Sequence, residues 1–391
     1  MARSLANRDP RVLYFTRGYT VHDQRFLTAL VEESHEVHFL SLDRNAVEQS
    51  SVLMPPGVKQ VDWLARLRSR HPWTIPRLVL SLKRAIRSVQ PDLVHAGPLQ
   101  SCAFLAALTG FRPLVSMSWG FDLLLDARRG PFWRWATRVA LRRSASMIVD
   151  SQALRRLAVD YGMRDNCIVM FPWGVDVAHF RPIEPCRSGP AEGDASVRIL
   201  SSRPWEPMYG VDTIADAFIV ASEILAARDD TTLSMTMLGG GSLAGYIRNV
   251  LGEGVVADRV DFVGYVPQQN MPACYQAADL YVSASHSDGT SISLLEAFAC
   301  GLPAIVSDIP GNREWIVPGE NGWLFRGGDS EDLAKRIVDA IGQRTRLQQM
   351  RRVSRTVAET RGDWSKNRLG IFQAYEIART AEDARKKGGI R

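Results

Sequence analysis

The sequence predicts an α/β protein built from two doubly wound, Rossmann-like domains. Short apolar runs rich in β-branched residues alternate with helical patterns along the chain. Each run is almost continuously apolar, which is typical of parallel strands covered by helices on both faces. The pattern stops at a stretch rich in Pro, Gly and Ser, residues 181–196, and then begins again. A chain of 391 residues is long enough for two such domains.

The first half opens with the apolar run RVLYFT at 11–16, a loop at Gly18, and a helical pattern from about residue 23 to 33. Five more runs are predicted strands: EVHFLSL (36–42), DLVHA (92–96), PLVSMS (113–118), SMIVD (146–150) and CIVMF (167–171). We therefore assign residues 1–185 to an N-terminal domain.

The second half repeats this alternation. Its predicted strands are VRILSS (197–202), LSMTML (233–238), RVDFVG (259–264), DLYVSAS (279–285) and PAIVSD (303–308). Residues 186–365 form the predicted C-terminal domain, and residues 366–391 a final helix that packs back toward the N-terminal domain. Ligands are expected at the carboxyl ends of the strands, and a cleft between two such domains is a common binding site.

Composition points to a soluble globular protein, with 46% hydrophobic and 23% charged residues. The five cysteines are odd in number and scattered, so we expect free thiols in a reducing compartment. The first ten residues, MARSLANRDP, lack the apolar core of a secretory signal. The longest apolar stretch, CAFLAALTGF, is too short to span a bilayer. These features predict a cytoplasmic location.

Positive charge is concentrated in the first half. Residues 1–185 hold 25 Lys and Arg against 16 Asp and Glu, mainly through basic clusters at 66–87 and 128–143. Ordinary solvated helix faces would explain these clusters, and so would attraction to an anionic membrane or an acidic acceptor. Phe132, Trp133 and Trp135 in the second cluster suit a membrane interface. We expect no nucleic-acid partner, since no known nucleic-acid module is present.

The stretch SDGTSISLLEAFACGLP, residues 287–303, predicts a loop, a short helix and a tight stop. Ser293 with Glu296 fits a capping box, and Gly301 suits the position after the helix. A helix start with Gly and hydroxyl residues is a place for an anion such as phosphate. Asp288 would repel a phosphate, so we expect it to accept hydrogen bonds from the hydroxyls of a group joined to that phosphate.

Further motifs accompany this stretch: FPWGVDVAHFRP (171–182), SSRPWEPMYG, LGGGS, DFVGYVP and GENGWLF. As an ordered set they resemble the retaining nucleotide-sugar glycosyltransferases of family 4, which have the GT-B fold. The resemblance covers nearly the whole chain and is densest from 171 to 325. It implies two Rossmann-like domains facing a cleft, a nucleoside-diphosphate sugar as donor, and a hydroxyl on a glycan, lipid-linked or small-molecule acceptor.

The resemblance assigns roles around the short helix. Asp288 stands where the family usually has Glu and would contact hydroxyls of the transferred sugar. Glu296 would hold the ribose. Backbone amides of four residues would bind the diphosphate: Gly289, Thr290, Ser291 and Ile292.

Other donor contacts are implied elsewhere. Arg203 would bind the donor phosphates, because a guanidinium can bind two phosphate oxygens at once. The family's nearby Lys is absent, and Tyr209 would either hydrogen-bond a phosphate or merely pack. Gly18 would lie near the phosphates. The turn that receives the nucleobase is matched by Gly264, Tyr265 and Val266.

On the acceptor side, the family's His-Gly-x-Asp-like element reads Trp-Gly-Phe-Asp at 119–122. Trp119 would stack on a sugar or pack in the core, and Asp122 would orient acceptor or sugar. Tyr19 and His22 follow the first strand and are further candidates. His95 ends a strand, where core packing and ligand contact are equally expected.

The resemblance implies front-face substitution, in which the leaving phosphate helps to deprotonate the acceptor. Arg203, Asp288 and Asp122 are the candidate catalytic residues. No Asp-x-Asp cation site is present, so we expect neither metal nor cofactor. Two alternatives stay open: a nucleotide-sugar epimerase of related fold, and a catalytically weak binding subunit, since the Lys and the first Glu are both changed.

Overall fold

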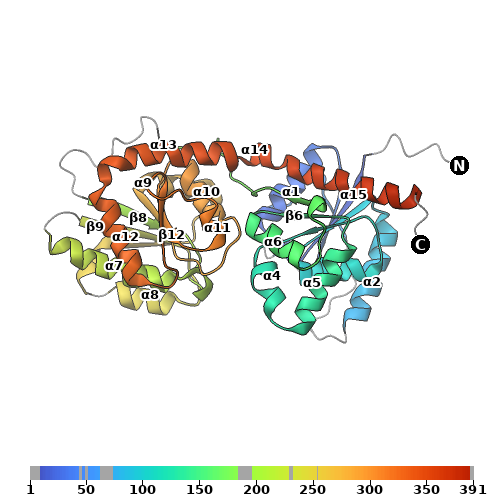
Figure 1. Cartoon of the computed structure of the whole chain (residues 1–391), viewed down its shortest axis with the longest axis horizontal. Helices are drawn as coiled ribbons and strands as arrows, with labels where there is room; N and C mark the ends of the chain where they lie inside the picture. Colours follow the sequence, from blue (N-terminus) through green and yellow to red (C-terminus); the bar gives the residue numbers. More distant parts are fainter. Residues whose placement is uncertain are drawn as a thin grey trace. The chain divides into compact units, whose positions relative to one another are not determined.

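The computed structural model describes residues 9–43, 46–48, 52–61, 74–183, 196–228, 232–252 and 254–387. The chain forms two compact units (Figure 1), one of Met1–Phe171 with Arg368–Arg391 and one of Pro172–Asn367. The division therefore precedes Pro172, earlier than the boundary at 185/186 that the linker composition predicts. Most of that linker, residues 184–195, lies outside the described residues.

Unit 1 contains a parallel sheet of seven strands in the order β3-β2-β1-β4-β5-β6-β7. The strands are β1 (Arg11–Thr16), β2 (Glu36–Ser41), β3 (Lys59–Gln60), β4 (Leu93–Ala96), β5 (Leu114–Met117), β6 (Ser146–Val149) and β7 (Ile168–Met170). Every residue of β4, β5 and β6 is buried, as expected of parallel strands covered on both faces.

Helices surround this sheet (Figure 1). They are α1 (Val21–Glu32), α2 (Ile75–Val89), α3 (Phe104–Thr109), α4 (Phe121–Leu124), α5 (Pro131–Arg143), α6 (Gln152–Asp160) and α15 (Leu369–Lys387), with short turns η2 (Leu99–Ala103), η3 (Asp126–Arg128) and η4 (Asp165–Cys167). Thr20 and Asp23 form a capping box that starts α1. The last helix, α15, buries Ile371, Ala374 and Tyr375 in this unit.

Unit 2 contains a second parallel sheet, in the order β10-β9-β8-β11-β12-β13. Its strands are β8 (Ser196–Ser201), β9 (Thr232–Leu238), β10 (Val260–Gly264), β11 (Leu280–Ser283), β12 (Ala304–Ser307) and β13 (Gly322–Phe325). In each sheet the first strand, β1 or β8, lies in the interior. The next two strands in the chain extend the sheet on one side of it and the later strands extend it on the other side, so both sheets are doubly wound.

The helices of unit 2 are α7 (Val211–Ala226), α8 (Ala244–Leu251), α9 (Met271–Ala277), α10 (Ile292–Ala299), α11 (Pro310–Arg313), α12 (Ser330–Gly342), α13 (Arg344–Arg361) and α14 (Trp364–Asn367). Three short turns complete it: η5 (Pro207–Tyr209), η6 (Gly254–Arg259) and η7 (Gln268–Asn270). Its core includes the large side chains Trp205, Phe218 and Phe298, all almost fully buried.

One arginine explains why residues after Phe171 belong to unit 2. Arg355 on α13 donates from Nη1 to the carbonyl oxygen of Phe180 at 2.7 Å and from Nη2 to that of Val177 at 2.9 Å. The same Nη1 donates to the carbonyl oxygen of Ala299 at the end of α10. Charge-assisted bonds of this kind fix the segment 177–180 on unit 2 before the linker begins.

Candidate active site

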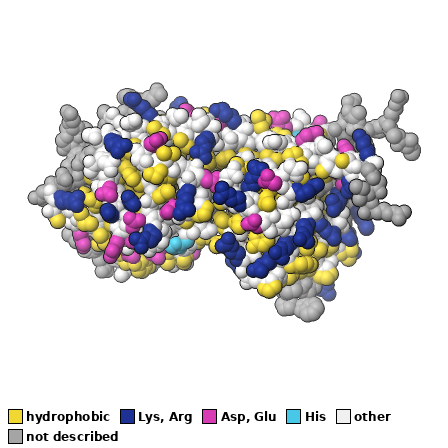
Figure 2. All heavy atoms as spheres, viewed as in Figure 1, with side chains coloured by type: hydrophobic (Ala, Val, Ile, Leu, Met, Phe, Trp, Pro, Cys, Tyr) yellow, Lys and Arg dark blue, Asp and Glu magenta, His cyan; other side chains and the backbone are white. Residues whose placement is uncertain are grey.

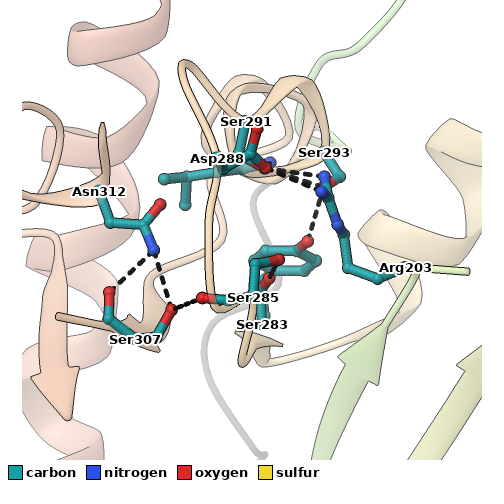
Figure 3. Close-up of polar contacts among 10 residues, drawn as sticks. Arg203, Ser283, Ser285, Asp288, Ser291, Ser293, Ser307 and Asn312 are labelled. Atoms are coloured by element: carbon teal, nitrogen blue, oxygen red, sulfur yellow. Dashed lines mark hydrogen bonds and ion pairs between the residues drawn. The ribbon is translucent and has the colours of Figure 1, made fainter. Parts of the chain in front are cut away.

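Arg203 lies in the loop after β8, at the carboxyl end of that strand (Figure 3). Its Nη2 lies 2.8 Å from Oδ2 of Asp288, and its Nη1 donates to the hydroxyls of Ser291 and Ser293, each at 3.2 Å. Arg203 therefore has a structural partner, Asp288, which its place in the sequence does not reveal. The loop after β11 and the start of α10 thus converge on one guanidinium.

The surroundings of this pair keep the Arg203 guanidinium charged. Burial is the largest single influence and would lower the pKa of Arg203, but the charge of Asp288 together with the nearby tyrosine hydroxyls outweighs it, and the pKa is raised. Arg203 therefore stays protonated in a site where its side chain is mostly buried. A cation held this way offers a fixed positive charge at the sheet edge.

Tyr209 supports the same guanidinium from another side. The guanidinium carbon of Arg203 lies 4.3 Å from the centre of the Tyr209 ring, a cation–π contact. Tyr209 belongs to η5, which ends at Gly210 with φ of +59°. A Cβ at Gly210 would lie 2.3 Å from the carbonyl oxygen of Ala284, so only Gly lets this turn approach β11. The Tyr209 ring thus packs on Arg203, and its expected hydrogen bond to a phosphate remains a prediction.

The start of α10 differs from the expected capping box. Ser291 is the N-cap and accepts a hydrogen bond from the amide of Leu294, whereas Glu296 lies too far along the helix to close a box. Ser293 instead accepts from the hydroxyl of Tyr281 at 2.8 Å as well as from Arg203. The predicted end is confirmed, since Gly301 follows the C-cap with φ of +78°.

A polar network holds the loop that precedes α10 (Figure 3). Asn312 on α11 donates from Nδ2 to the carbonyl oxygen of Ser307, and the Ser307 hydroxyl donates to the carbonyl oxygen of Ser285. Gly311, beside Asn312, comes so close that a Cβ there would lie 2.0 Å from the carbonyl oxygen of Gly289. The chain after β12 therefore sets the position of the loop that carries Asp288 and Gly289.

Glu296 is buried on α10 and both of its carboxylate oxygens have donors. Gln268 donates from Nε2 at 2.7 Å and Tyr275 donates from its hydroxyl at 2.8 Å. The neighbouring Ser202 hydroxyl lies 3.1 Å from the same Tyr275 oxygen. The carboxylate is held in place by side chains from η7 and α9, so its expected role toward a ribose remains a prediction.

The turn after β10 is exposed. Tyr265 is 75% exposed, and Val266 and Gly264 are partly exposed. Gly264 has φ of +78°, and its carbonyl oxygen accepts from the amide of Gly239 at 2.7 Å. Gly239 in turn lies against the carbonyl of Arg203, so the turn, the glycine run and the Arg203 loop form one connected edge.

In unit 1, the residues expected on the acceptor side divide into two groups. His22 on α1 and Trp119 after β5 come together, with ring centres 6.3 Å apart, and both are partly exposed. Gly18 is partly exposed, with open space at its Cα. Tyr19 is buried instead, and its hydroxyl donates to the carbonyl oxygen of Leu53 at 2.8 Å.

Two other candidates of unit 1 are core residues; for Asp122 this corrects the expected ligand contact, and for His95 it matches one of the two roles expected. Asp122 has no exposed surface; its carboxylate accepts from the Ser118 hydroxyl at 2.5 Å and from the amides of Leu99 and Leu123. Burial raises the pKa of Asp122 to about 6. These bonds tie the loops after β4 and β5 together, which is a structural role.

His95 is equally buried. Its Nδ1 lies 2.9 Å from the hydroxyl of Tyr375 on α15, and burial lowers the pKa of His95 to about 3. A neutral imidazole joined to the last helix is a packing contact. The two readings that the sequence left open are thereby decided in favour of the core.

The model of glycosyltransferase family 4 matches residues 2–179, and that of glycosyl transferases group 1 matches residues 191–357. Together they account for both units. The chain belongs to these glycosyltransferases.

Two curated relatives illustrate the similarity of this glycosyltransferase. A D-inositol 3-phosphate glycosyltransferase of Nocardia farcinica is 27% identical over 58% of this chain and 51% of its own length. A GDP-mannose-dependent α-(1-6)-phosphatidylinositol monomannoside mannosyltransferase of Mycolicibacterium smegmatis is 26% identical over 92% of this chain and 96% of its own. The chain thus spans about half of the first relative and nearly all of the second.

Solved structures share the fold. Sucrose-phosphate synthase of Thermosynechococcus elongatus has a TM-score of 0.73 at 18% identity, covering 94% of this chain and 98% of its own. Anabaena HepE with UDP and glucose has a TM-score of 0.71 at 17% identity, covering 94% and 99%. These neighbours support two Rossmann-like domains of the GT-B class.

Several site residues of this glycosyltransferase escaped sequence reasoning. Ser293, Gln268 and Tyr275 bind Arg203 or Glu296 through side chains far apart in the chain, which no local pattern reveals. Gly311 and Asn312 had a signal, since PGN at 310–312 begins one residue after the predicted strand 303–308.

Within the described ranges, no group of three His, Cys, Asp or Glu side chains is arranged to hold a metal ion. Among the same residues, no helix has the length and apolar character needed to cross a membrane. The four described cysteines are free thiols, and Cys186 lies outside the described residues.

Proposed function

We propose that this glycosyltransferase moves a sugar from a nucleoside-diphosphate sugar to an acceptor hydroxyl with retention of the anomeric configuration. The observation that carries the proposal is the convergence of Arg203, Ser291 and Ser293 at the start of α10. A buried guanidinium beside a helix N-terminus suits an anion with several oxygens, and a diphosphate is such an anion.

Asp288 lies beside Arg203 at a position suited to a phosphate oxygen. The donor diphosphate would replace Asp288 as the partner of Arg203, because both are anions competing for one guanidinium. Asp288 then becomes available to accept hydrogen bonds from the hydroxyls of the sugar joined to that diphosphate. Arg203, Tyr209 and the amides of 289–292 hold the diphosphate, Glu296 the ribose, and the turn 264–266 the nucleobase.

The proposed step is front-face substitution. The bond between the anomeric carbon and the diphosphate oxygen breaks, and the acceptor oxygen bonds to the same face of that carbon. The acceptor proton passes to the departing diphosphate, so no protein nucleophile is needed. Arg203 stabilises the charge that grows on the leaving oxygen. Asp122 is withdrawn from the catalytic set because it is buried among its own donors.

The acceptor class comes from the relatives. One acts on phosphatidylinositol monomannoside with GDP-mannose, and the other is named for D-inositol 3-phosphate. We propose a phosphorylated or lipid-linked polyol or glycan as the acceptor of this chain, contacted in unit 1 by His22 and Trp119. We propose that neither a metal ion nor a cofactor takes part.

A two-stage experiment tests this function. Thermal unfolding is first followed with UDP, GDP and their common sugar conjugates, since a bound donor raises the melting temperature by mass action. The stabilising donor is then incubated with candidate acceptors, with and without EDTA, and the anomeric configuration of the product is read by NMR. An inverted product, EDTA-sensitive transfer, epimerised free donor, or donor binding without transfer would each contradict the proposal.

A further inference from the structure

The segment from Phe121 to Arg143, which forms α4, η3 and α5, presents an unusual surface. Apolar side chains that would normally be buried are exposed here: Phe121 is 36% exposed, Leu125 39%, Phe132 42% and Trp135 50%. Exposed aromatic and large aliphatic side chains grouped in one segment mark an interaction surface.

Exposed arginines accompany these apolar side chains. On α5, Arg138 and Arg142 follow Trp135 at i+3 and i+7 and so lie on its helix face, and Arg134 is exposed next to Trp135 in the chain. Arg128 and Arg129 are exposed just before this helix, and Arg129 lies over the Trp133 ring. Figure 2 shows Lys and Arg side chains gathered over the part of unit 1 where α4 and α5 lie in Figure 1, with hydrophobic side chains beside them.

No exposed acid balances this charge within the segment. All of residues 121–143 are described, and their two acids, Asp122 and Asp126, are both buried. Asp126 pairs with Arg129 at 3.0 Å, which leaves the other arginines of the segment facing solvent with no acid of the segment beside them. The exposed charge of this surface, which we call the α4–α5 surface, is therefore entirely positive.

The place of the α4–α5 surface in the fold matters too. α4 begins directly after Trp119 and Gly120, at the carboxyl end of β5. Trp119 contacts His22, so the surface adjoins the part of unit 1 proposed to meet the acceptor. If a layer of molecules bound to the α4–α5 surface, the hydroxyl groups of those molecules would lie at that edge of unit 1.

We infer that the α4–α5 surface binds the face of an anionic lipid bilayer. Arginines attract anionic headgroups, while Phe132 and Trp135 enter the interfacial region where amphipathic aromatic rings are stable. Charge complementarity together with exposed apolar rings favours a bilayer over a soluble polyanion, which offers no apolar phase for those rings. The inference rests on the proposed function only for the identity of the acceptor; lipid binding itself requires no catalysis.

The test is co-sedimentation of the full chain with phosphatidylcholine vesicles, with and without phosphatidylglycerol. The parent should bind the anionic vesicles and largely release them near 1 M salt, where the screening length is about 3 Å. Arg134→Gln with Arg138→Gln should weaken binding about 25-fold, taking about fivefold for each cation. Phe132→Ser with Trp135→Ser should weaken binding at every salt concentration.

Matched controls carry the same chemical changes elsewhere. Lys335→Gln with Arg352→Gln removes two exposed cations of unit 2, and Leu369→Ser removes an exposed apolar side chain of unit 1. Both should bind vesicles like the parent, and the charge variants should keep the parent's melting temperature. The Phe132→Ser with Trp135→Ser variant also loses ring contacts with Phe104, so its melting temperature should fall but stay above the assay temperature. Equal binding to neutral and anionic vesicles, undiminished binding of both surface variants, or equal losses in the controls would overturn the inference.

Failure of the two proposals can be told apart. Vesicle binding without any effect of nucleotides on the melting temperature would contradict the proposed function and leave the surface standing. Nucleotide binding without vesicle binding would contradict the inference about the α4–α5 surface and leave the proposed function standing.

Discussion

At the scale of single residues, the site is organised around Arg203. Its guanidinium is fixed by Asp288, two serine hydroxyls and the Tyr209 ring, which come from the loop after β11, the start of α10 and the turn η5. The resemblance to family 4 implied that Arg203 and Asp288 belong to one donor site, and both follow predicted strands. Their pairing could not be predicted, since it depends on how far the two loops reach toward each other.

Replacing Arg203 separates its electrostatic role from its packing role. We expect Arg203→Ala to lower kcat/KM by an amount worth about 2–4 kcal/mol, the size found for a lost charge-stabilising donor. Arg203→Lys should recover part of the loss, because it keeps the charge and loses the planar fork. Steady-state kinetics check this, with Arg352→Gln on the exposed face of α13 as control. A near-parental kcat/KM in Arg203→Ala would refute it.

Asp288 allows a test of sugar contact. Asp288→Glu adds one methylene to a site fitted to the shorter side chain. It should raise the activation free energy of transfer by about 1–3 kcal/mol and so lower the transfer rate. Asp288→Asn should also lower it, because the charged acceptor for sugar hydroxyls is lost. Neither change should weaken binding of the free nucleoside diphosphate, which has no sugar. Parental transfer by Asp288→Glu would show that Asp288 does not contact the sugar.

At the scale of elements, the sequence predicted most strands and missed two. β3 has only two residues, and β13 was seen as a motif but not as a strand. Short edge strands carry too few apolar residues to show a pattern. The burial of Asp122 and His95 also depends on tertiary packing, since polar residues after strands look alike in sequence whether they face a ligand or the core.

Close contact between α11 and the loop before α10 gives an element-scale prediction. In Gly311→Ala, the new Cβ would lie 2.0 Å from the carbonyl oxygen of Gly289, so this loop must move. Affinity for the nucleoside diphosphate should fall at least tenfold, because the amides of 289–292 shift with the loop. Calorimetric titration measures this. Gly245→Ala, where no atom lies within 4 Å, is the control and should bind like the parent.

The contact between β4 and α15 predicts a pH effect. The pKa of His95 is lowered to about 3 by burial, against an ordinary value near 6.5, so the unfolded chain binds a proton more readily than the folded chain. This site therefore makes the free energy of unfolding rise with pH between about 3 and 6.5. In His95→Gln that rise should be shallower, as measured by urea denaturation across this range. An unchanged slope would argue against a buried neutral His95.

At the scale of the whole molecule, α15 belongs to the unit in which the chain begins. Ser146 donates to the carbonyl oxygen of Ala374, and Tyr375 meets His95, so the last helix covers part of the first sheet. Sequence reasoning could predict a final helix from periodicity. The exact point where the chain leaves unit 1 depends on contacts such as those of Arg355 with 177–180, which composition does not reveal.

Truncation tests the contribution of α15. A chain ending at Asn367 loses the buried side chains of Ile371, Ala374 and Tyr375, and we expect unit 1 to aggregate or lose its cooperative unfolding transition. A chain ending at Lys387 keeps α15 and should unfold like the parent. Calorimetry compares the two. An intact transition in the shorter chain would show that unit 1 is complete without its last helix.

The central claim is that Arg203 and the start of α10 hold the diphosphate of a nucleotide-sugar donor. Calorimetric titration of UDP and GDP into the full chain and into Arg203→Ala tests it most directly. We predict that at least one nucleotide binds the parent and that its dissociation constant rises at least tenfold in Arg203→Ala, while Arg352→Gln binds like the parent. Equal affinity in the parent and Arg203→Ala, or no binding of either nucleotide to the parent, would contradict the claim.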